Sequence, residues 1–279
     1  MTYCETVEKS ILSDFRETLW LPLLEAVERY KLIENGDKIA VCISGGKDSM
    51  LLAKLVQLFH RQGSVDFEPL FLVMDPGYNE ANRRQIEKNC ALLEIPARIF
   101  ESNIFDVTAS VGSSPCYLCA RMRRGHLYAK ARELGCGKIA LGHHFSDVIE
   151  TTLIGMFYGS QLQGMMPKIH STNFEGMELV RPLYCIKEED IIKWRNFNSL
   201  EFIRCACRFT EQLSHEAEEN SSSKRLEAKL LIKRLSEDYP DVESSIFDSL
   251  HNLDLDSFPA YKAGGREYDF NSLFASKSE

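Results

Sequence analysis

The sequence lacks three features that would each define a class of protein. It has no apolar run near the roughly 18 residues that a membrane-spanning helix needs. Its first residues, MTYCETVEKS, have neither the basic start nor the apolar centre of a secretion signal. It also has no excess of positive charge, because its formal net charge is −8. We therefore expect a cytoplasmic protein with no membrane partner, and any contact with nucleic acid should be confined to a local basic groove.

Alternating strand and helix patterns predict the fold class. Five short β-rich runs alternate with segments that have helical periodicity. The runs are Lys38–Ile43, Pro69–Asp75, Ala97–Phe100, Lys138–Leu141 and the edge segment Arg181–Cys185. Such alternation predicts an α/β fold with a parallel sheet of the five-stranded type, covered by helices on both faces. A ligand should then bind beyond the C-terminal ends of the strands. Ser44, Asp75 and Gly142 all lie at such ends.

Outside this core the pattern predicts helices. Apolar residues recur at helical spacing from Glu5 to Leu32, which predicts an N-terminal helical segment over residues 1–36. The central domain should cover residues 37–210. Residues 211–279 should form a C-terminal helical extension: an acidic, serine-rich linker to Ser223, helices over Lys224–Leu235 and Val242–Leu250, and a loosely held tail after Pro259.

The stretch IAVCISGGKDSMLL, residues 39–52, has the parts of a phosphate-binding loop with unusual spacing. A Walker A loop would have glycine where Val41 stands, and serine or threonine where Asp48 follows Lys47. The small residues still let backbone N–H groups approach an anion, and the following helix points its positive end at the same place. Lys47 can neutralise phosphate, and Asp48 can hold magnesium or cap the helix. SGGKDS at a strand–helix junction resembles the PP-loop of the ATP pyrophosphatase superfamily, which cleaves ATP between the α- and β-phosphates.

Two further clusters are candidates for chemistry. Cys116 and Cys119 form a CxxC pair, which could be a redox dithiol, a zinc half-site or part of an iron–sulfur site. Cys205-Ala-Cys207 is a second group far downstream. Next to the CxxC pair, Arg121, Arg123 and Arg124 form a basic patch that fits either a solvated helix face or contact with RNA phosphate or transition-state charge.

Together, the segment PCYLCARMRRGHLYAKARELGCGKIALGHHFSDVIETTLIGMFYG and the MMPK, VRPL and RLSEDYPDVESSIFDSL stretches resemble the tRNA 2-thiocytidine synthetase family. The resemblance covers most of the chain. It implies that ATP, with Mg2+, adenylates the C2 carbonyl oxygen of a cytidine in the tRNA anticodon loop, after which sulfur replaces that oxygen. It also implies a [4Fe-4S] cluster held by three cysteines, with one iron left open for sulfide. The tRNA and a sulfur donor (sulfide or a cysteine desulfurase system) are then partners, and a homodimer is possible.

The resemblance assigns roles to individual residues. Catalytic roles fall on Lys47, Asp48, Asp147 and Arg123 or its neighbour Arg124. Cluster ligation falls on Cys116, Cys119 and Cys205. Nucleotide binding falls on the PP-loop, on the acidic position after the second strand and on the GHH turn, which here are Ser44, Gly45, Gly46, Lys47, Asp48, Ser49, Asp75, Gly142 and His143.

One departure keeps alternatives open. The family usually has a second CxxC followed by Gly-Ser-Gln, whereas this chain has Cys205-Ala-Cys207 followed by Arg-Phe-Thr-Glu. The alternatives are a thiolase of another base, a ligase like the tRNA lysidine synthetases, or a nucleotide- and metal-binding redox sensor. The basic residues Lys224, Arg225, Lys229, Lys233 and Arg234 are either a tRNA-facing stripe or a solvated helix face, with Leu226, Leu230 and Leu231 packed inward.

Overall fold

The computed structural model describes residues 2–102, 104, 115–203 and 218–276, with the backbone alone at 115–120, 218–223, 273 and 275–276. The chain forms two compact units, Met1–Leu230 and Leu231–Glu279. The first unit holds a six-stranded sheet and the second a two-stranded one. No helix in the described part of the chain is long and apolar enough to cross a membrane.

The sheet of the first unit confirms the predicted α/β class. Its strands, in the order β3-β2-β1-β4-β6-β5, are β1 (Lys38–Ile43), β2 (Glu68–Asp75), β3 (Ala97–Glu101), β4 (Lys138–Ala140), β5 (Lys168–His170) and β6 (Glu178–Val180). All neighbours are parallel except the β5–β6 pair. The predicted edge segment Arg181–Cys185 is wrong, because those residues form the turn that follows β6. Pro182 has no N–H to give to a strand ladder, so pairing ends at Val180.

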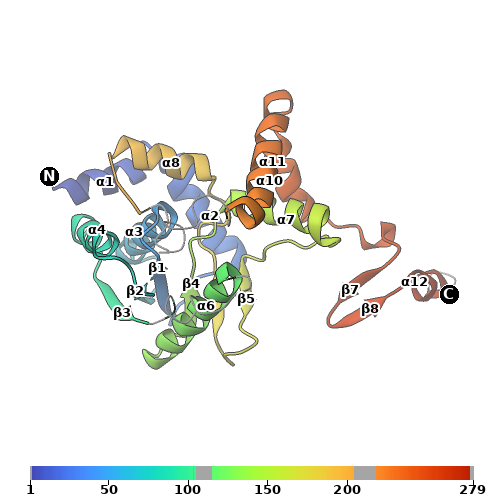
Figure 1. Ribbon diagram of the computed structural model, residues 1–279, viewed down its shortest axis with the longest axis horizontal. Helices are drawn as coiled ribbons and strands as arrows, with labels where there is room; N and C mark the ends of the chain where they lie inside the picture. Colours follow the sequence, from blue (N-terminus) through green and yellow to red (C-terminus); the bar gives the residue numbers. More distant parts are fainter. Residues whose placement is uncertain (1, 103, 105–114, 204–217, 277–279) are drawn as a thin grey trace. The chain divides into compact units, whose positions relative to one another are not determined.

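Helices cover both faces of this sheet, as predicted (Figure 1). Helices α3 (Lys47–Gln62) and α4 (Glu80–Leu92) lie on one face, and α6 (Pro115–Glu133) lies on the other. On the α6 face, Tyr128 and Ala131 join one buried apolar cluster with strand residues, among them Ala40, Leu72 and Ile139. Helix α6 begins at Pro115, a residue that suits the first position of a helix, so it includes the CxxC pair.

The N-terminal segment is helical, but it consists of three pieces in place of one continuous helix. These are α1 (Tyr3–Leu12), a π-helical turn (Arg16–Trp20) and α2 (Leu21–Tyr30). Pro22 cannot donate a helical hydrogen bond, and the turn before it uses longer-range bonds, such as Phe15 N to Ser10 O at 2.9 Å. Buried Lys54 of α3 donates to Glu8 of α1 at 2.7 Å and so ties this segment to the core.

Two further helices of the first unit follow strands of the sheet. Helix α7 (Phe145–Gly159) follows β4, and α8 (Glu188–Phe197) follows β6 and contacts α3. Helix α10 (Glu218–Asp238) begins inside the predicted linker and continues into the second unit. Leu226 and Leu230 of α10 are 55% and 56% exposed, so the prediction that they pack inward is wrong.

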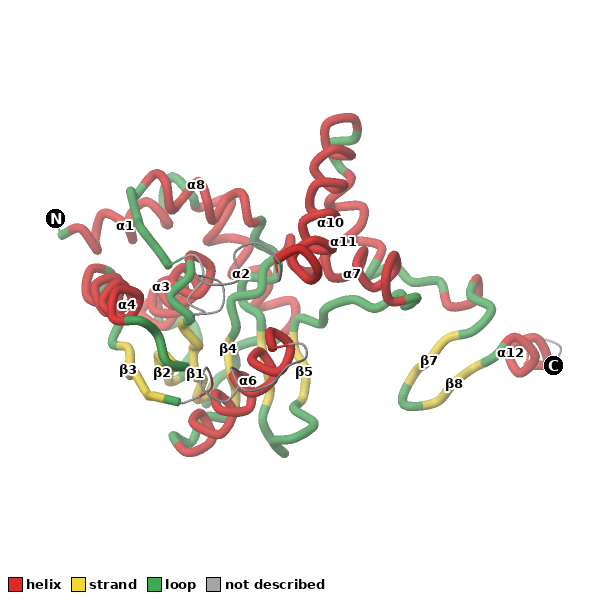
Figure 2. The backbone as a smooth tube through the Cα atoms, in the orientation of Figure 1, coloured by secondary structure: helices red, strands yellow, loops and turns green. Residues whose placement is uncertain are grey.

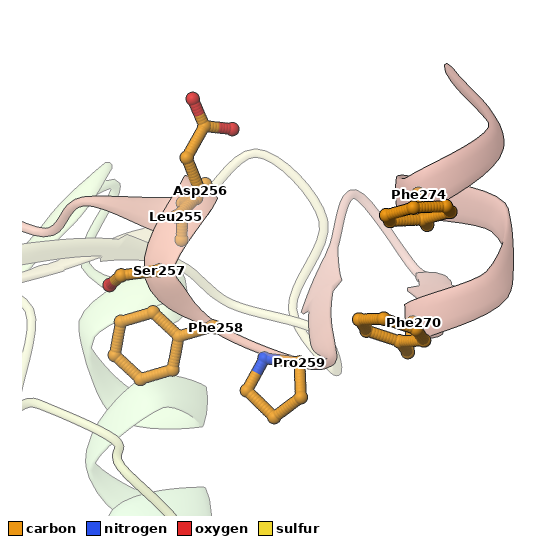
Figure 3. A pocket seen from close by; sticks show the side chains of 7 residues that line it. All are labelled: Leu255, Asp256, Ser257, Phe258, Pro259, Phe270 and Phe274. Carbon is orange, nitrogen blue, oxygen red and sulfur yellow. The ribbon is translucent and has the colours of Figure 1, made fainter. Parts of the chain in front are cut away.

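The second unit has regular secondary structure after Pro259, where the sequence predicts a loosely held tail (Figure 2). It contains α11 (Val242–Ser249), a hairpin of β7 (Tyr261–Ala263) and β8 (Arg266–Tyr268), and α12 (Phe270–Ser276). The rings of Tyr261 and Tyr268 stack across the hairpin at 4.8 Å. Phe270 and Phe274 extend from α12 and, with Phe258 and Pro259, line a small apolar pocket of about 230 Å³ (Figure 3).

Replacing Leu55 by alanine should test how far the first unit depends on the contact between α3 and the sheet. Leu55 is fully buried, so Leu55→Ala should lower the free energy of unfolding by about 2–5 kcal/mol. Leu12 is 44% exposed, and Leu12→Ala should change it by about 0.5 kcal/mol or less. Urea denaturation of both variants measures the difference, and equal losses would contradict the described packing.

Candidate functional site

The candidate site lies at the edge of the sheet where the neighbouring strands β1 and β4 end and their loops begin. From β1 the chain moves outward through β2 to β3, then returns to place β4 on the other side of β1. This reversal is a topological switch point, where open parallel sheets bind ligands. It brings the SGGKDS loop after β1 next to the Gly142–His144 turn after β4.

Glycine is required at two positions of these loops. A Cβ atom on Gly142 would lie 3.1 Å from Ser49 N and 3.2 Å from the carbonyl carbon of Asp48, so the turn packs directly on the first turn of α3. Gly45 has φ +87°, and a Cβ there would lie 2.6 Å from the Ile86 side chain of α4. Both close approaches restrict the backbone of the SGGKDS loop to one conformation.

The start of α3 has the features of an anion-binding site. Gly46 is the N-cap and supplies no side-chain acceptor, so the first N–H groups of α3 lack the usual cap. Ser49 Oγ accepts from Ser44 N at 3.1 Å and donates to Gly46 O at 3.0 Å, which fixes the loop.

A pocket of about 380 Å³ opens beside this loop. It is lined by Cys42, Ile43, Ser44, Asp48, Ser49, Met74, Tyr78, Arg123, Arg124, Leu127, Leu141, Gly142, His143 and Asp147. Burial lowers the pKa of the His143 ring to about 4, and the charge of Arg181 adds to this effect. Burial and the charge of Arg124 likewise lower the pKa of Arg181 to about 10. Protonated groups are therefore disfavoured here, and an anionic ligand would relieve that cost.

One polar contact and one unpartnered nitrogen lie among the residues that line this 380 Å³ pocket. Arg123 Nη2 of α6 lies 3.0 Å from the Tyr78 hydroxyl and donates to it. His143 Nδ1 is buried and has no hydrogen-bond partner in the described part of the chain. A ligand that bonds to His143 would remove this unfavourable state.

Two carboxylates that line this pocket, Asp48 and Asp147, face one ring nitrogen of His144. His144 caps α7, and its Nε2 lies 3.8 Å from Asp48 Oδ1 and 3.5 Å from Asp147 Oδ2. Asp147 also accepts from His144 N at 3.0 Å, which fixes its carboxylate. Oxygen ligands of this kind are those that Mg2+ prefers, so the donor set fits a magnesium site.

Lys47 lies on the other side of Asp48. Its Nζ is 3.0 Å from Asp48 Oδ1 and 2.9 Å from Glu188 Oε1. Burial alone would raise the pKa of Glu188, but the hydrogen bonds from Lys229 and Lys47 outweigh it and lower the pKa to about 2. A second pocket, of about 350 Å³, is lined by Lys47, Asp48, His144, Asp147, Glu150, Glu188, Arg225, Leu226 and Lys229.

Most of the predicted site residues come together around these pockets. Asp75 lines neither pocket, and its carboxylate instead accepts from Gly77 N at 2.9 Å and Tyr78 N at 2.7 Å and pairs with Arg83 at 3.0 Å. It thereby shapes the turn that carries Tyr78, and a contact with nucleotide stays a prediction.

The structure describes only part of the predicted cluster site. The backbone at Cys116 and Cys119 lies in the first two turns of α6, whereas Cys205 and Cys207 lie outside the described residues. The sequence missed Glu150 and Glu188 as site residues, because both look like ordinary polar positions of amphipathic helices. The sequence analysis assigned Arg225 and Lys229 to a basic helix face. Their spacing of four residues was the available sign that both lie on the same side of the helix.

This fold and site define a PP-loop ATP-binding protein, and the family model of the PP-loop domain matches residues 22–209. Curated relatives named tRNA-cytidine(32) 2-sulfurtransferase include one from Syntrophotalea carbinolica, 34% identical over 232 residues, covering 82% of this chain and 86% of the relative. Another, from Acinetobacter baylyi, is 34% identical and covers 89% of this chain and 79% of the relative. The chain belongs to this family of tRNA sulfurtransferases, a family of transferases whose activity implies a tRNA substrate.

A solved structure has the same fold. The U34-tRNA thiolase NcsA from Methanococcus maripaludis, determined with its [4Fe-4S] cluster, matches with a TM-score of 0.64 at 18% identity. The match covers 85% of this chain and 80% of that one. At this identity the likeness confirms the predicted fold.

Replacing Gly142 by alanine should separate the two loops of the site. The added Cβ meets backbone atoms of Asp48 and Ser49, so the loop of residues 44–49 must shift, and ATP affinity should fall by about tenfold or more. Gly137→Ala is the matched control, because a Cβ there meets nothing within 4 Å. Titration calorimetry with MgATP measures both, and unchanged affinity in Gly142→Ala would contradict this geometry.

Proposed function

We propose that the protein thiolates cytidine 32 of tRNA in an ATP-dependent reaction. This is the modification that its relatives' name, tRNA-cytidine(32) 2-sulfurtransferase, describes. The observation that carries the proposal is the 380 Å³ pocket, which joins the PP-loop, the GHH turn and the arginines of α6 in one cavity. A tRNA substrate makes the cytoplasm the expected location. Sulfide or a cysteine desulfurase system is the proposed sulfur source, and a homodimer stays a prediction.

The described residues suit the activation step. A base carbonyl oxygen is a poor leaving group, so the oxygen must first be adenylated, which releases pyrophosphate. In our proposal the N–H groups at the start of α3 bind phosphate, while Lys47 offsets its charge. Asp48 and Asp147 would hold Mg2+, which supplies further charge neutralisation when bound.

Helix α6 is the reason to place sulfur delivery beside the same pocket. Positions 116, 119 and 123 are three and four residues apart, so they share one side of the helix. Arg123 lines the pocket, and the CxxC pair therefore lies one to two turns from it. A [4Fe-4S] cluster on Cys116, Cys119 and Cys205 would leave one iron free to hold sulfide. Arg123 and Arg124 would contact the tRNA or the charge of the activated base.

The alternatives differ in their need for cysteine and in the base that they modify. A ligase of the lysidine synthetase kind needs ATP, a tRNA and an amine but no cluster. A redox sensor would bind nucleotide without adenylating a base. A thiolase of another position would act on tRNA that lacks cytidine 32. The CxxC pair on the pocket-lining helix favours the thiolase.

Anaerobic reconstitution tests the proposal. Purified protein with iron and sulfide should absorb in the visible blue and, with MgATP and tRNA, convert cytidine 32 to 2-thiocytidine, detected by nucleoside mass spectrometry. A tRNA with uridine at position 32 should stay unmodified. Thiolation of that tRNA at another base would identify a different substrate position, and no thiolation of any tRNA would refute the proposal.

Cysteine variants distinguish a cysteine that binds the cluster from a cysteine that has no role in the reaction. Cys116→Ser should lose bound iron and thiolation while it keeps MgATP binding, because the PP-loop is unchanged. Cys185→Ala is the control, since Cys185 is a partly buried free cysteine whose thiol pKa is raised to about 12 by burial. Full thiolation by Cys116→Ser would instead favour a reaction without the cluster.

A further inference from the structure

We propose that Arg225 and Lys229 of helix α10 bind the pyrophosphate leaving group. Neither residue belongs to the PP-loop, the GHH turn or the cysteine motifs. This inference deepens the proposed function and rests on it for the identity of the reaction, although binding of pyrophosphate can be measured without the tRNA or sulfur.

The contacts of α10 place both cations at the Lys47 side of the site. Arg225 Nε donates to Glu150 Oε2 at 2.7 Å, and its Nη2 donates to Asp147. Lys229 Nζ donates to Glu188, whose other oxygen accepts from Lys47 Nζ at 2.9 Å. One carboxylate of α8 therefore joins the lysine of the PP-loop to the lysine of α10.

Two adjacent pockets share Asp48 and Asp147 but differ in their other walls. The 380 Å³ pocket has Ser44, Tyr78 and His143, whereas the 350 Å³ pocket has Lys47, Arg225 and Lys229. The PP-loop lysine is the group expected to meet the β- and γ-phosphates. The 350 Å³ pocket is therefore the place for those phosphates.

The charges of the 350 Å³ pocket fit an anion that arrives with a metal ion. Its four carboxylates are Asp48, Asp147, Glu150 and Glu188, and its three cations are Lys47, Arg225 and Lys229. A magnesium ion on Asp48 and Asp147 would compete with Arg225 for Asp147, which frees guanidinium donors for phosphate oxygens. Glu150 is 4% exposed and would keep the guanidinium at the pocket.

These cations act on the step that releases pyrophosphate. The base carbonyl oxygen forms a bond to the α-phosphorus, and the bond from that phosphorus to the bridging oxygen breaks. Its electron pair leaves on the pyrophosphate, where negative charge accumulates. Guanidinium and ammonium groups beside that oxygen stabilise the charge as it develops.

Calorimetric binding of three probes to the full chain tests this inference. Magnesium pyrophosphate should bind about tenfold more weakly to Arg225→Gln and to Lys229→Gln, and about a hundredfold more weakly to the double variant. The affinity of these variants for MgATP should fall by similar factors. AMP has no β-phosphate, so its affinity should stay unchanged, which also shows that each variant is folded. Arg225→Lys should recover part of the lost affinity.

Lys224→Gln is the matched control. It removes the same charge from the same turn of α10, but Lys224 Nζ lies over the Tyr158 ring, 5.0 Å from its centroid. It should bind all three probes like the unchanged protein. Wild-type affinity for pyrophosphate in the Arg225 and Lys229 variants, an equal loss for AMP, or no pyrophosphate binding by the unchanged protein would overturn the inference. Normal pyrophosphate binding without any thiolation would refute the proposed function alone.

Discussion

The contact between the Gly142 turn and the first turn of α3 is the constraint on which the site depends. It exists because β4 pairs with β1, with Ala140 beside Val41, so both strands end at the same edge of the sheet. Only a residue without a side chain fits at this position, because a Cβ atom on Gly142 would lie 3.1 Å from Ser49 N. That approach brings Asp48 and Ser49 next to His143 and His144, which lie about 95 residues away in the sequence.

The electrostatic environment differs between the two sides of the contact that the Gly142 turn makes with α3. Around His143 the guanidinium groups of Arg181 and Arg124 oppose the carboxylate of Asp147, and burial keeps the pKa of His143 and of Arg181 below their ordinary values. Around Lys47 the neighbours are carboxylates, and burial of the lysine is outweighed by Asp48 and Glu188, so its pKa is raised. Lys47 therefore stays charged, whereas His143 stays neutral at neutral pH. An acidic chain can thus hold cations at the edge where the strands end, each of them beside carboxylates that a metal ion or an anion with its metal would rearrange.

The sequence predicted the elements that carry a local signal and missed those decided by distant contacts. The strand Lys38–Ile43 and the SGGKDS loop have both hydrophobic pattern and motif, and the structure has them at the predicted place. The strand pair β5–β6 has only three residues in each strand, too few for periodicity to show. Glu188, Arg225 and Lys229 belong to the site only because α8 and α10 bring them to Lys47. The spacing of four residues predicts that Arg225 and Lys229 share a helix face, but it does not predict that this face meets Lys47. The site residues that fall outside the described part of the chain, Cys205 above all, stay predictions.

Helix α6 links the two kinds of chemistry that the sequence suggests. Its first turns carry the CxxC pair, and its next turn carries Arg123, which bonds to Tyr78 at the pocket wall. Four residues of helix span about 6 Å, so Cys119 and Arg123 keep a fixed and short separation along the helix axis. Tyr128 and Ala131, two turns further on, are buried against the sheet and anchor the helix. A sulfur-carrying group at the start of α6 would therefore be held at a set distance from the activated base. The third cysteine ligand of that proposal, Cys205, lies outside the described residues and stays a prediction.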